Sequence, residues 1–294
     1  MNSNNTTKFQ KTCKPKIRKE FETLYTNWRS NNGSAGYNEF AKLKEQVYPT
    51  GLVMINENNR YKTDFQFPDP DLSKTVAINM MPIVVEDLST YTDDTLRYRD
   101  IIKVCSHVSG LNNKKCYLTI HESWVAPGLT QRRKGLHVES PRIGEGKNEF
   151  YYWGQGECLV DRPDGGIFMA SNVTGSCEVY NVKIDTDAIG LGGDIEHLRS
   201  ALPKDSRKLL KAGELVWITD RTPHSSLPVD HLVYRQFFRL VTSNISAWYS
   251  QHSTANPLGC EVGENILIIN ENKFTSDATA PGSDTSTSTL CSII

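Results

Sequence analysis

The chain has 294 residues, which suits one large domain or two small ones and is long enough to bury a sizeable core. Its 33 Lys and Arg residues balance 34 Asp and Glu residues, so we expect no nucleic-acid partner. No apolar run approaches the roughly 20 residues that a membrane span requires. The first ten residues lack the apolar core of a signal peptide, and the seven cysteines form no C-x-x-C pair. We therefore expect a cytoplasmic protein with reduced thiols.

The N-terminal part is predicted to be helical after a disordered tail. Residues 1–13 are polar, and a basic stretch precedes the first acid, Glu20. Apolar residues at helical spacing follow Pro15, and a second such series lies near residues 40–47. We expect both helices to pack outside the core. A third helix is predicted at about residues 93–108.

From Cys116 onward the pattern changes to short runs rich in β-branched and aromatic residues, separated by Gly, Pro, Asn and Asp. This pattern is typical of a β-barrel or sandwich, so we predict a mainly β domain of the α+β class. The domain is expected to span residues 14–274, with a β core at about 116–245 and one helical interruption at about 194–211. The runs are CYLTIHESWV, FYYWG, GIFMASNV, CEVYNVKI, ELVWITD and VYRQFFRLVTS.

The C-terminal residues 275–294 are rich in Ser and Thr and are predicted to be a flexible tail. The tail ends in Cys291-Ser292-Ile293-Ile294, which fits the C-a-a-X prenylation pattern and makes Cys291 a candidate lipidation site. A chance match of four residues is the alternative. One lipid gives only marginal membrane binding, so peripheral membrane association would need a second signal such as the basic N-terminal stretch.

Two histidines and one glutamate form a candidate metal site. Side chains at positions i and i+2 of a strand point to the same side, so His137 and Glu139 can act together as ligands. A site with two histidines and one carboxylate needs a third ligand from elsewhere, and His224, which follows a buried strand, is the candidate. His121-Glu122 serves less well, because adjacent strand residues point to opposite faces.

Arg235 and Arg239 lie four positions apart in a predicted strand and therefore on the same side of it. A buried arginine is costly unless an anion pairs with it. Because guanidinium groups bind carboxylates bidentately, the pair indicates a carboxylate ligand. A solvated pair on an edge strand is the alternative.

Together these residues resemble the pattern of the Fe(II)/2-oxoglutarate-dependent oxygenases, in which a His-x-Asp/Glu pair, a distal histidine and a later arginine recur. Arg235 and Arg239 stand 11 and 15 positions after His224. The stretch AGELVWITDRTPHSSLP is similar to the distal-histidine strand of the phytanoyl-CoA hydroxylase and taurine dioxygenase branches. Glu139 departs from the commoner Asp. The resemblance covers about residues 116–245 and implies a double-stranded β-helix, a cupin-like barrel.

The resemblance also implies an activity. His137, Glu139 and His224 would bind Fe(II), and the enzyme would use O2 and 2-oxoglutarate to abstract a hydrogen atom from a C–H bond of a small substrate. Arg235 would pair with the distal carboxylate of 2-oxoglutarate. The other cofactor-binding candidates are Arg239, for the second carboxylate or an anionic substrate group, and Thr222 and Ser226, as hydrogen-bond donors.

The substrate side is expected in the loop that leads to the His137 pair and in the aromatic run after it. The candidate substrate-binding residues are Trp124, Gln131, Arg132, Arg133 and Tyr152. If the Arg-Arg-Lys run is functional, the substrate is anionic, and an ordinary solvated loop is the alternative.

Two other functions remain open. One is a non-catalytic binding module on the same barrel, tethered to a membrane. The other is a cupin-type metalloenzyme that does not use 2-oxoglutarate and takes His121 as an extra ligand. The sequence does not predict the oligomeric state.

Overall fold

The computed structural model describes residues 52–54, 65–139, 152–159, 162–184, 188–242 and 245–270. The two predicted N-terminal helices, both predicted tails and Cys291 lie outside these residues, and the proposals for them stay predictions. Among the described residues, no helix is both long enough and apolar enough to cross a membrane.

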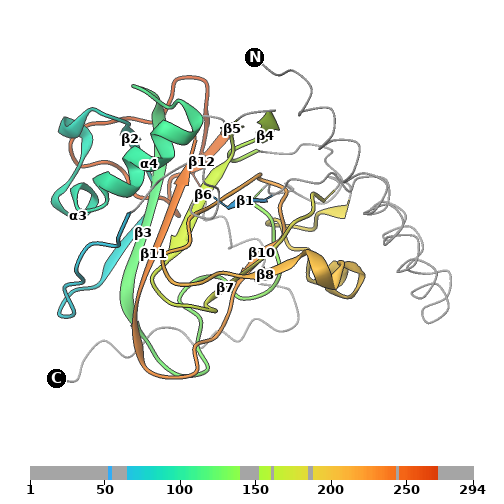
Figure 1. Ribbon diagram of the computed structural model, residues 1–294. Helices are drawn as coiled ribbons and strands as arrows, with labels where there is room; N and C mark the ends of the chain where they lie inside the picture. Colours follow the sequence, from blue (N-terminus) through green and yellow to red (C-terminus); the bar gives the residue numbers. More distant parts are fainter. Residues whose placement is uncertain are drawn as a thin grey trace, which may run out of the picture.

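A six-stranded sheet forms the centre of the fold, and all its neighbouring strands are antiparallel. Its order is β1 (Leu52–Met54), β9 (Val216–Ile218), β6 (Ile167–Ser171), β11 (Val233–Val241), β3 (Lys115–Val125) and β2 (Val76–Val84) (Figure 1). The prediction of a mainly β chain is confirmed. The β core begins earlier than predicted, because β2 pairs with β3 along most of its length.

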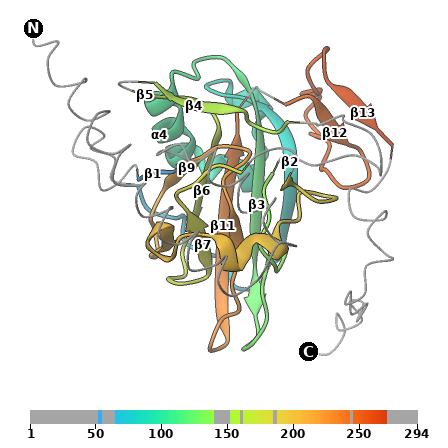
Figure 2. The ribbon, with the colours of Figure 1, turned by 90° about the vertical axis from the view of Figure 1, so that its right-hand side faces the viewer.

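Three smaller sheets complete the β structure. A three-stranded antiparallel sheet has the order β10 (His224–Ser226), β7 (Cys177–Tyr180) and β8 (Arg207–Leu209). The pair β4 (Gly156–Leu159) and β5 (Arg162–Gly165) is antiparallel. The pair β12 (Ala247–Tyr249) and β13 (Leu267–Ile269) is parallel and lies beside β2 (Figure 2).

The predicted third helix is confirmed, in two pieces. α3 (Asp93–Leu96) follows the 3-10 turn η1 (Leu88–Thr90) and begins after Thr92, whose hydroxyl accepts a bond from the Thr95 amide. α4 (Arg99–Ser109) ends at Gly110, which has the left-handed conformation common at helix C-termini.

The helical interruption predicted at about 194–211 is confirmed in part, because its helical residues form 3-10 turns and end before residue 207. The segment holds two 3-10 turns, η3 (Glu196–Ala201) and η4 (Lys204–Ser206), followed by strand β8. Pro203 separates the two turns, and Leu202 before it is extended. Proline disfavours the helical conformation of the residue before it, which accounts for the break.

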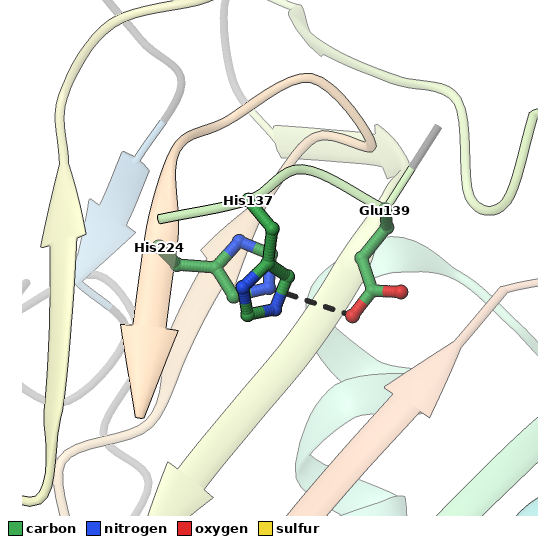
Figure 3. A group of neighbouring side chains, drawn as sticks. All are labelled: His137, Glu139 and His224. Carbon is green, nitrogen blue, oxygen red and sulfur yellow. Dashed lines mark ion pairs between the residues drawn. The ribbon is translucent and has the colours of Figure 1, made fainter. Parts of the chain in front are cut away.

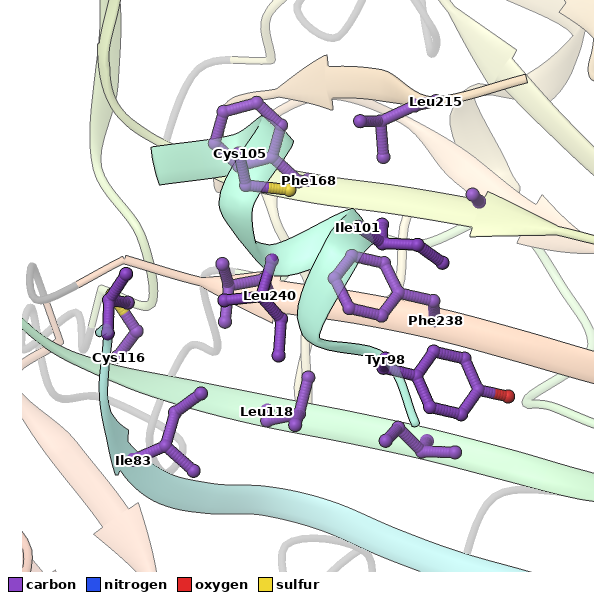
Figure 4. Packing of buried hydrophobic residues seen from close by; sticks show 14 of the residues in the cluster. Ile83, Tyr98, Ile101, Cys105, Cys116, Leu118, Phe168, Leu215, Phe238 and Leu240 are labelled. Carbon is purple, nitrogen blue, oxygen red and sulfur yellow. The ribbon is translucent and has the colours of Figure 1, made fainter. Parts of the chain in front are cut away.

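Strands β3 and β11 separate an apolar face from a polar one. Cys116, Leu118 and Ile120 of β3 and Phe238 and Leu240 of β11 pack with α4 in one buried cluster (Figure 4). The alternate residues of both strands point to the opposite face, where the three-stranded sheet lies. A second buried cluster joins both sheets there, and it includes Met169, Cys177, Val179 and Phe237. The region between the two sheets therefore holds this apolar cluster together with buried polar side chains such as Thr119 and Arg239.

Gly166 lies between β5 and β6, where a side chain has no room. A Cβ at this position would come within 2.2 Å of the indole nitrogen of Trp217, and its φ of +77° disfavours other residues. We expect Gly166→Ala to lower the free energy of unfolding by about 3 kcal/mol or more, through overpacking and backbone strain. Gly175→Ala is the matched control, because its φ is +73° but nothing lies within 4 Å of the added Cβ. Gly175→Ala should lower the free energy of unfolding by about 1 kcal/mol. Urea denaturation of both variants measures the two free energies of unfolding. Equal losses in the two variants would show that the contact with Trp217 adds no cost.

Candidate metal centre and its cavity

The backbone brings His137 opposite His224. The two residues exchange both backbone hydrogen bonds, each at 3.0 Å, although His137 lies outside the named strands. Directly opposite residues of an antiparallel pair project to the same side. The Glu139 amide continues this pairing by donating to the carbonyl of Asp220, at 2.9 Å. Glu139 stands two positions after His137, so all three side chains project to one side of the pairing.

The three side chains converge. One potential ligand atom from each of His137, Glu139 and His224 lies within 4.8 Å of the others. His224 Nε2 is 3.4 Å from Glu139 Oε1, and the two imidazole rings are 4.5 Å apart between centroids (Figure 3). Glu139 and His224 are buried, and His137 is partly buried. This arrangement has the size and the donor types of a metal site.

Backbone carbonyls fix the orientation of both imidazoles. His137 Nδ1 lies 2.8 Å from the carbonyl of Gly135, and His224 Nδ1 lies 2.9 Å from the carbonyl of Thr222. A carbonyl only accepts, so Nδ1 carries the proton in each ring. Nε2 of each ring then keeps its lone pair for a metal ion. Hydrogen bonds of this kind to the second ring nitrogen are the usual support of metal-binding histidines.

Electrostatics also favour a neutral His137. Burial, followed by the nearby His224, holds the pKa of His137 well below its usual value. A histidine must be neutral to bind a metal, so this site needs no proton release from His137 at neutral pH.

A buried acid on the outer side of the three-stranded sheet supports β10. Glu178 of β7 is fully buried and accepts a hydrogen bond from the Ser225 hydroxyl, at 2.7 Å. It also pairs with Arg199 and Arg207, at 2.6 Å each. Since Ser225 follows His224 directly, this network holds the strand that carries the distal histidine.

The two arginines of β11 both point inward, so a solvated pair on an edge strand is excluded. Arg235 is fully buried and donates to Ser171 Oγ at 3.2 Å, Ser226 Oγ at 2.8 Å and Cys177 Sγ at 3.0 Å. Within the described residues, no carboxylate forms an ion pair with Arg235. A buried guanidinium surrounded by neutral groups is costly by itself, and it fits a site for an added anion.

Arg239 has a partner that the sequence did not indicate. Its Nη1 donates to Glu139 Oε1, and Nη2 reaches Thr119 Oγ1 at 3.2 Å and Asn79 Oδ1 at 3.4 Å. Its buried Nε has no hydrogen-bond partner among the described residues. The guanidinium therefore contacts a metal-ligand candidate directly, and Nε remains as the donor that a bound anion could use.

A small cavity of about 40 Å³, partly open to solvent, adjoins the three metal-ligand candidates. Arg132 and Arg133 line it from the predicted substrate loop. Among the predicted cofactor residues, Ser226 and Arg239 line it. Arg133 donates to the carbonyl of Gly192 at 2.7 Å and lies 3.6 Å from Asp194.

The other substrate candidates do not line this cavity. Trp124 is half exposed, donates to the carbonyl of Leu72 and packs edge-on against Tyr234. Gln131 donates to Ser123 of β3 and to the carbonyl of Arg235 in β11, so it fixes its loop to these two strands. Tyr152 is fixed through its amide, which donates to Ser246. Thr222, a cofactor candidate, shares a hydrogen bond with Thr219 and supports the turn before His224.

Sequence reasoning missed four residues of the cavity wall, namely Met169, Cys177, Ser225 and Phe237. Phe237 could have been found, because it lies between Arg235 and Arg239 at the two-residue period of β11. The other positions depend on strand pairings that are not visible in the sequence.

His121 is not part of the metal-ligand cluster. Its ring nitrogens lie 3.0 and 3.2 Å from Arg132 Nη1. Burial, followed by the charge of Arg132, lowers the pKa of His121 to about 3. His121 is therefore neutral and accepts from Arg132, and it is not placed as the extra ligand that a cupin-type site would use.

The low pKa of His121 predicts acid sensitivity. Between pH 7.5 and pH 5 the unfolded chain protonates His121 while the folded protein does not, so the free energy of unfolding falls as the pH falls. This residue alone should account for about 2 kcal/mol of that loss. Urea denaturation of metal-free wild-type protein and of His121→Gln, each at pH 7.5 and pH 5, measures the contribution of His121. The variant should lose less stability on acidification, and parallel losses would contradict the assignment.

Comparisons with known proteins give only weak similarity. No protein-family model and no curated protein matches the chain. Among solved structures, HygX from Streptomyces hygroscopicus with iron bound has 9% identity and a TM-score of 0.33, over 54% of this chain and 71% of HygX. ThoJ, a non-heme monooxygenase solved as a nickel complex, has 10% identity and a TM-score of 0.25, over 54% of this chain and 58% of ThoJ. CytC3 with Fe(II) and alpha-ketoglutarate has 15% identity and a TM-score of 0.26, over 78% of this chain and 84% of CytC3. Similarity at this level assigns no activity to this chain.

Proposed function

We propose that this protein is an Fe(II)- and 2-oxoglutarate-dependent oxygenase that oxidises a C–H bond of a small organic substrate. The observation that carries the proposal is the convergence of His137, Glu139 and His224 beside a cavity, with both Nε2 atoms free to bind. Two imidazoles and one carboxylate on one side of an iron leave the other positions open for co-substrate and oxygen.

The proposal includes the fold that such enzymes share. The six-stranded and three-stranded sheets are antiparallel, and a single buried cluster joins them. The ligand candidates come from β10 and from the segment paired with it, and the cavity beside them is lined by residues of both sheets, which supports a site between the two sheets. These features support a double-stranded β-helix.

Arg235 and Ser226 support the use of 2-oxoglutarate. Ser226 lines the cavity, and its hydroxyl accepts from the buried guanidinium of Arg235, which forms no ion pair within the described residues. A carboxylate placed against this pair would receive charge-assisted hydrogen bonds and would neutralise the buried charge. Arg239 Nε offers a further donor in the cavity wall.

The chain's own residues would position the reactants. When bound, iron and 2-oxoglutarate together supply the activation of O2. His137 and His224 hold their orientation through backbone carbonyls, and Arg239 holds the Glu139 carboxylate through a hydrogen bond to Oε1. Phe237, Met169 and Cys177 add apolar surface to a cavity wall that also holds Arg132, Arg133 and Arg239.

Anaerobic reconstitution with Fe(II), followed by metal analysis and a succinate assay with 2-oxoglutarate and ascorbate, tests the proposal. We expect about one iron per chain and slow succinate formation even without substrate. Iron uptake without succinate formation would favour a metalloenzyme that does not use 2-oxoglutarate. No iron uptake and no succinate would favour a non-catalytic binding module.

A further inference from the structure

Arg132 lies in the cavity wall without an acidic partner among the described residues. Its guanidinium carbon is 5.3 Å from the centroid of the Phe237 ring, and Nη1 contacts the ring nitrogens of His121. Neither Nε nor Nη2 has a hydrogen-bond partner within the described residues. The aromatic ring and the imidazole hold the guanidinium in place and leave one edge of it free for a ligand.

The charge of Arg132 is not cancelled by its surroundings. His121 is neutral because its pKa is lowered to about 3. Burial, followed by the charge of Arg239, lowers the pKa of Arg132 to about 9, so Arg132 is still protonated at neutral pH. Arg133, the next residue, differs because Asp194 lies beside it.

The charges around the cavity do not balance without a further anion. Arg132 and Arg239 line the cavity, and Arg235 lies behind Ser226 of its wall. Glu139 is the one buried carboxylate among the described residues that line it. Bound Fe(II) would add two positive charges, and 2-oxoglutarate would add two negative ones. Positive charge therefore remains in excess after the metal and the co-substrate are counted, and uncompensated buried charge is costly.

We propose that Arg132 anchors an anionic substrate, a small organic molecule with a carboxylate or a similar oxyanion. The inference deepens the proposed oxygenase function and rests on it for the role of this anion as substrate. The oxyanion would lie against the free edge of Arg132 and reduce its repulsion with Arg239. The rest of the substrate would then extend along Phe237 toward His137 and Glu139.

Calorimetry with a matched pair of probes tests the anion site. Protein loaded with Mn(II) and saturated with N-oxalylglycine, which occupies the 2-oxoglutarate position without turnover, is titrated with butanoate and with neutral butanamide at constant ionic strength. We expect butanoate to bind at least about 10-fold more tightly than butanamide. Arg132→Gln should remove this preference, and Arg132→Lys should keep only part of it. Arg99→Gln, which removes an exposed charge on α4, should bind butanoate as the wild type does.

The outcomes separate this inference from the proposed function. Equal binding of the two probes by the wild type, or an unchanged preference in Arg132→Gln, would overturn the anion site. If the wild type fails to take up Mn(II) or N-oxalylglycine, the oxygenase proposal fails, and the same titration of the metal-free protein still tests Arg132. Should Arg132→Gln fail to fold, as judged by thermal melting, Arg132→Lys decides, because unchanged butanoate affinity in that variant contradicts bidentate binding.

Discussion

Replacing His224 with alanine should lower the affinity for Fe(II) by at least about 100-fold and abolish succinate formation. The change removes one of three ligands whose donor atoms lie within 4.8 Å of one another. The remaining His137 and Glu139 would hold the metal only through two bonds, and Arg239 already competes for the Glu139 carboxylate. Titration with Co(II), followed by its visible absorption, measures affinity and coordination in one experiment.

The matched control is His231→Ala. His231 lies on the surface, where its imidazole pairs with the exposed Asp230 and contacts no metal-ligand candidate. This variant should bind metal and form succinate as the wild type does. The backbone bonds that join residues 137 and 224 do not involve the removed ring, so His224→Ala is expected to fold. Unchanged metal affinity in a folded His224→Ala protein would refute the role of His224.

Local periodicity was sufficient to predict the parts of the site that depend on a single strand. Arg235 and Arg239 share a face because β11 is regular, and His137 and Glu139 project together because the backbone between them is extended. The helix α4 could also be predicted from the sequence, since its apolar residues follow the helical period. For these elements local backbone geometry and burial agree.

The remaining features depend on contacts between segments far apart in the chain. The sequence of β2 is an apolar run that contains Met80 and Pro82 and has no regular period. It forms a strand because it pairs with β3, with a bulge between Ile78 and Met81. The Glu139–Arg239 pair joins residues 100 positions apart, so no spacing rule predicts it. Pro203 is visible in the sequence and accounts for the break between the two 3-10 turns of the predicted helical segment.

Replacing Arg235 with methionine should weaken 2-oxoglutarate binding at least about 100-fold while metal affinity changes little. Arg235 forms no ion pair within the described residues and does not touch the metal-ligand candidates, whereas its guanidinium would meet a carboxylate beside Ser226. Equilibrium binding of 2-oxoglutarate to the Mn(II)-loaded protein gives the affinity. Arg99→Met, on the far side of the large sheet, is the matched control and should bind 2-oxoglutarate normally.

The stability of Arg235→Met distinguishes a ligand-binding arginine from a structural one. A structural buried ion pair loses about 3–5 kcal/mol when one partner is removed, whereas an unpaired buried charge can be replaced by an apolar side chain of similar size at little cost. We therefore expect the ligand-free variant to unfold within about 1 kcal/mol of the wild type, even though hydrogen bonds to Ser171, Ser226 and Cys177 are lost. Added 2-oxoglutarate should raise the melting temperature of the Mn(II)-loaded wild type but not that of the variant. A strongly destabilised variant that still gains stability from 2-oxoglutarate would show that Arg235 supports the fold and that the co-substrate binds elsewhere.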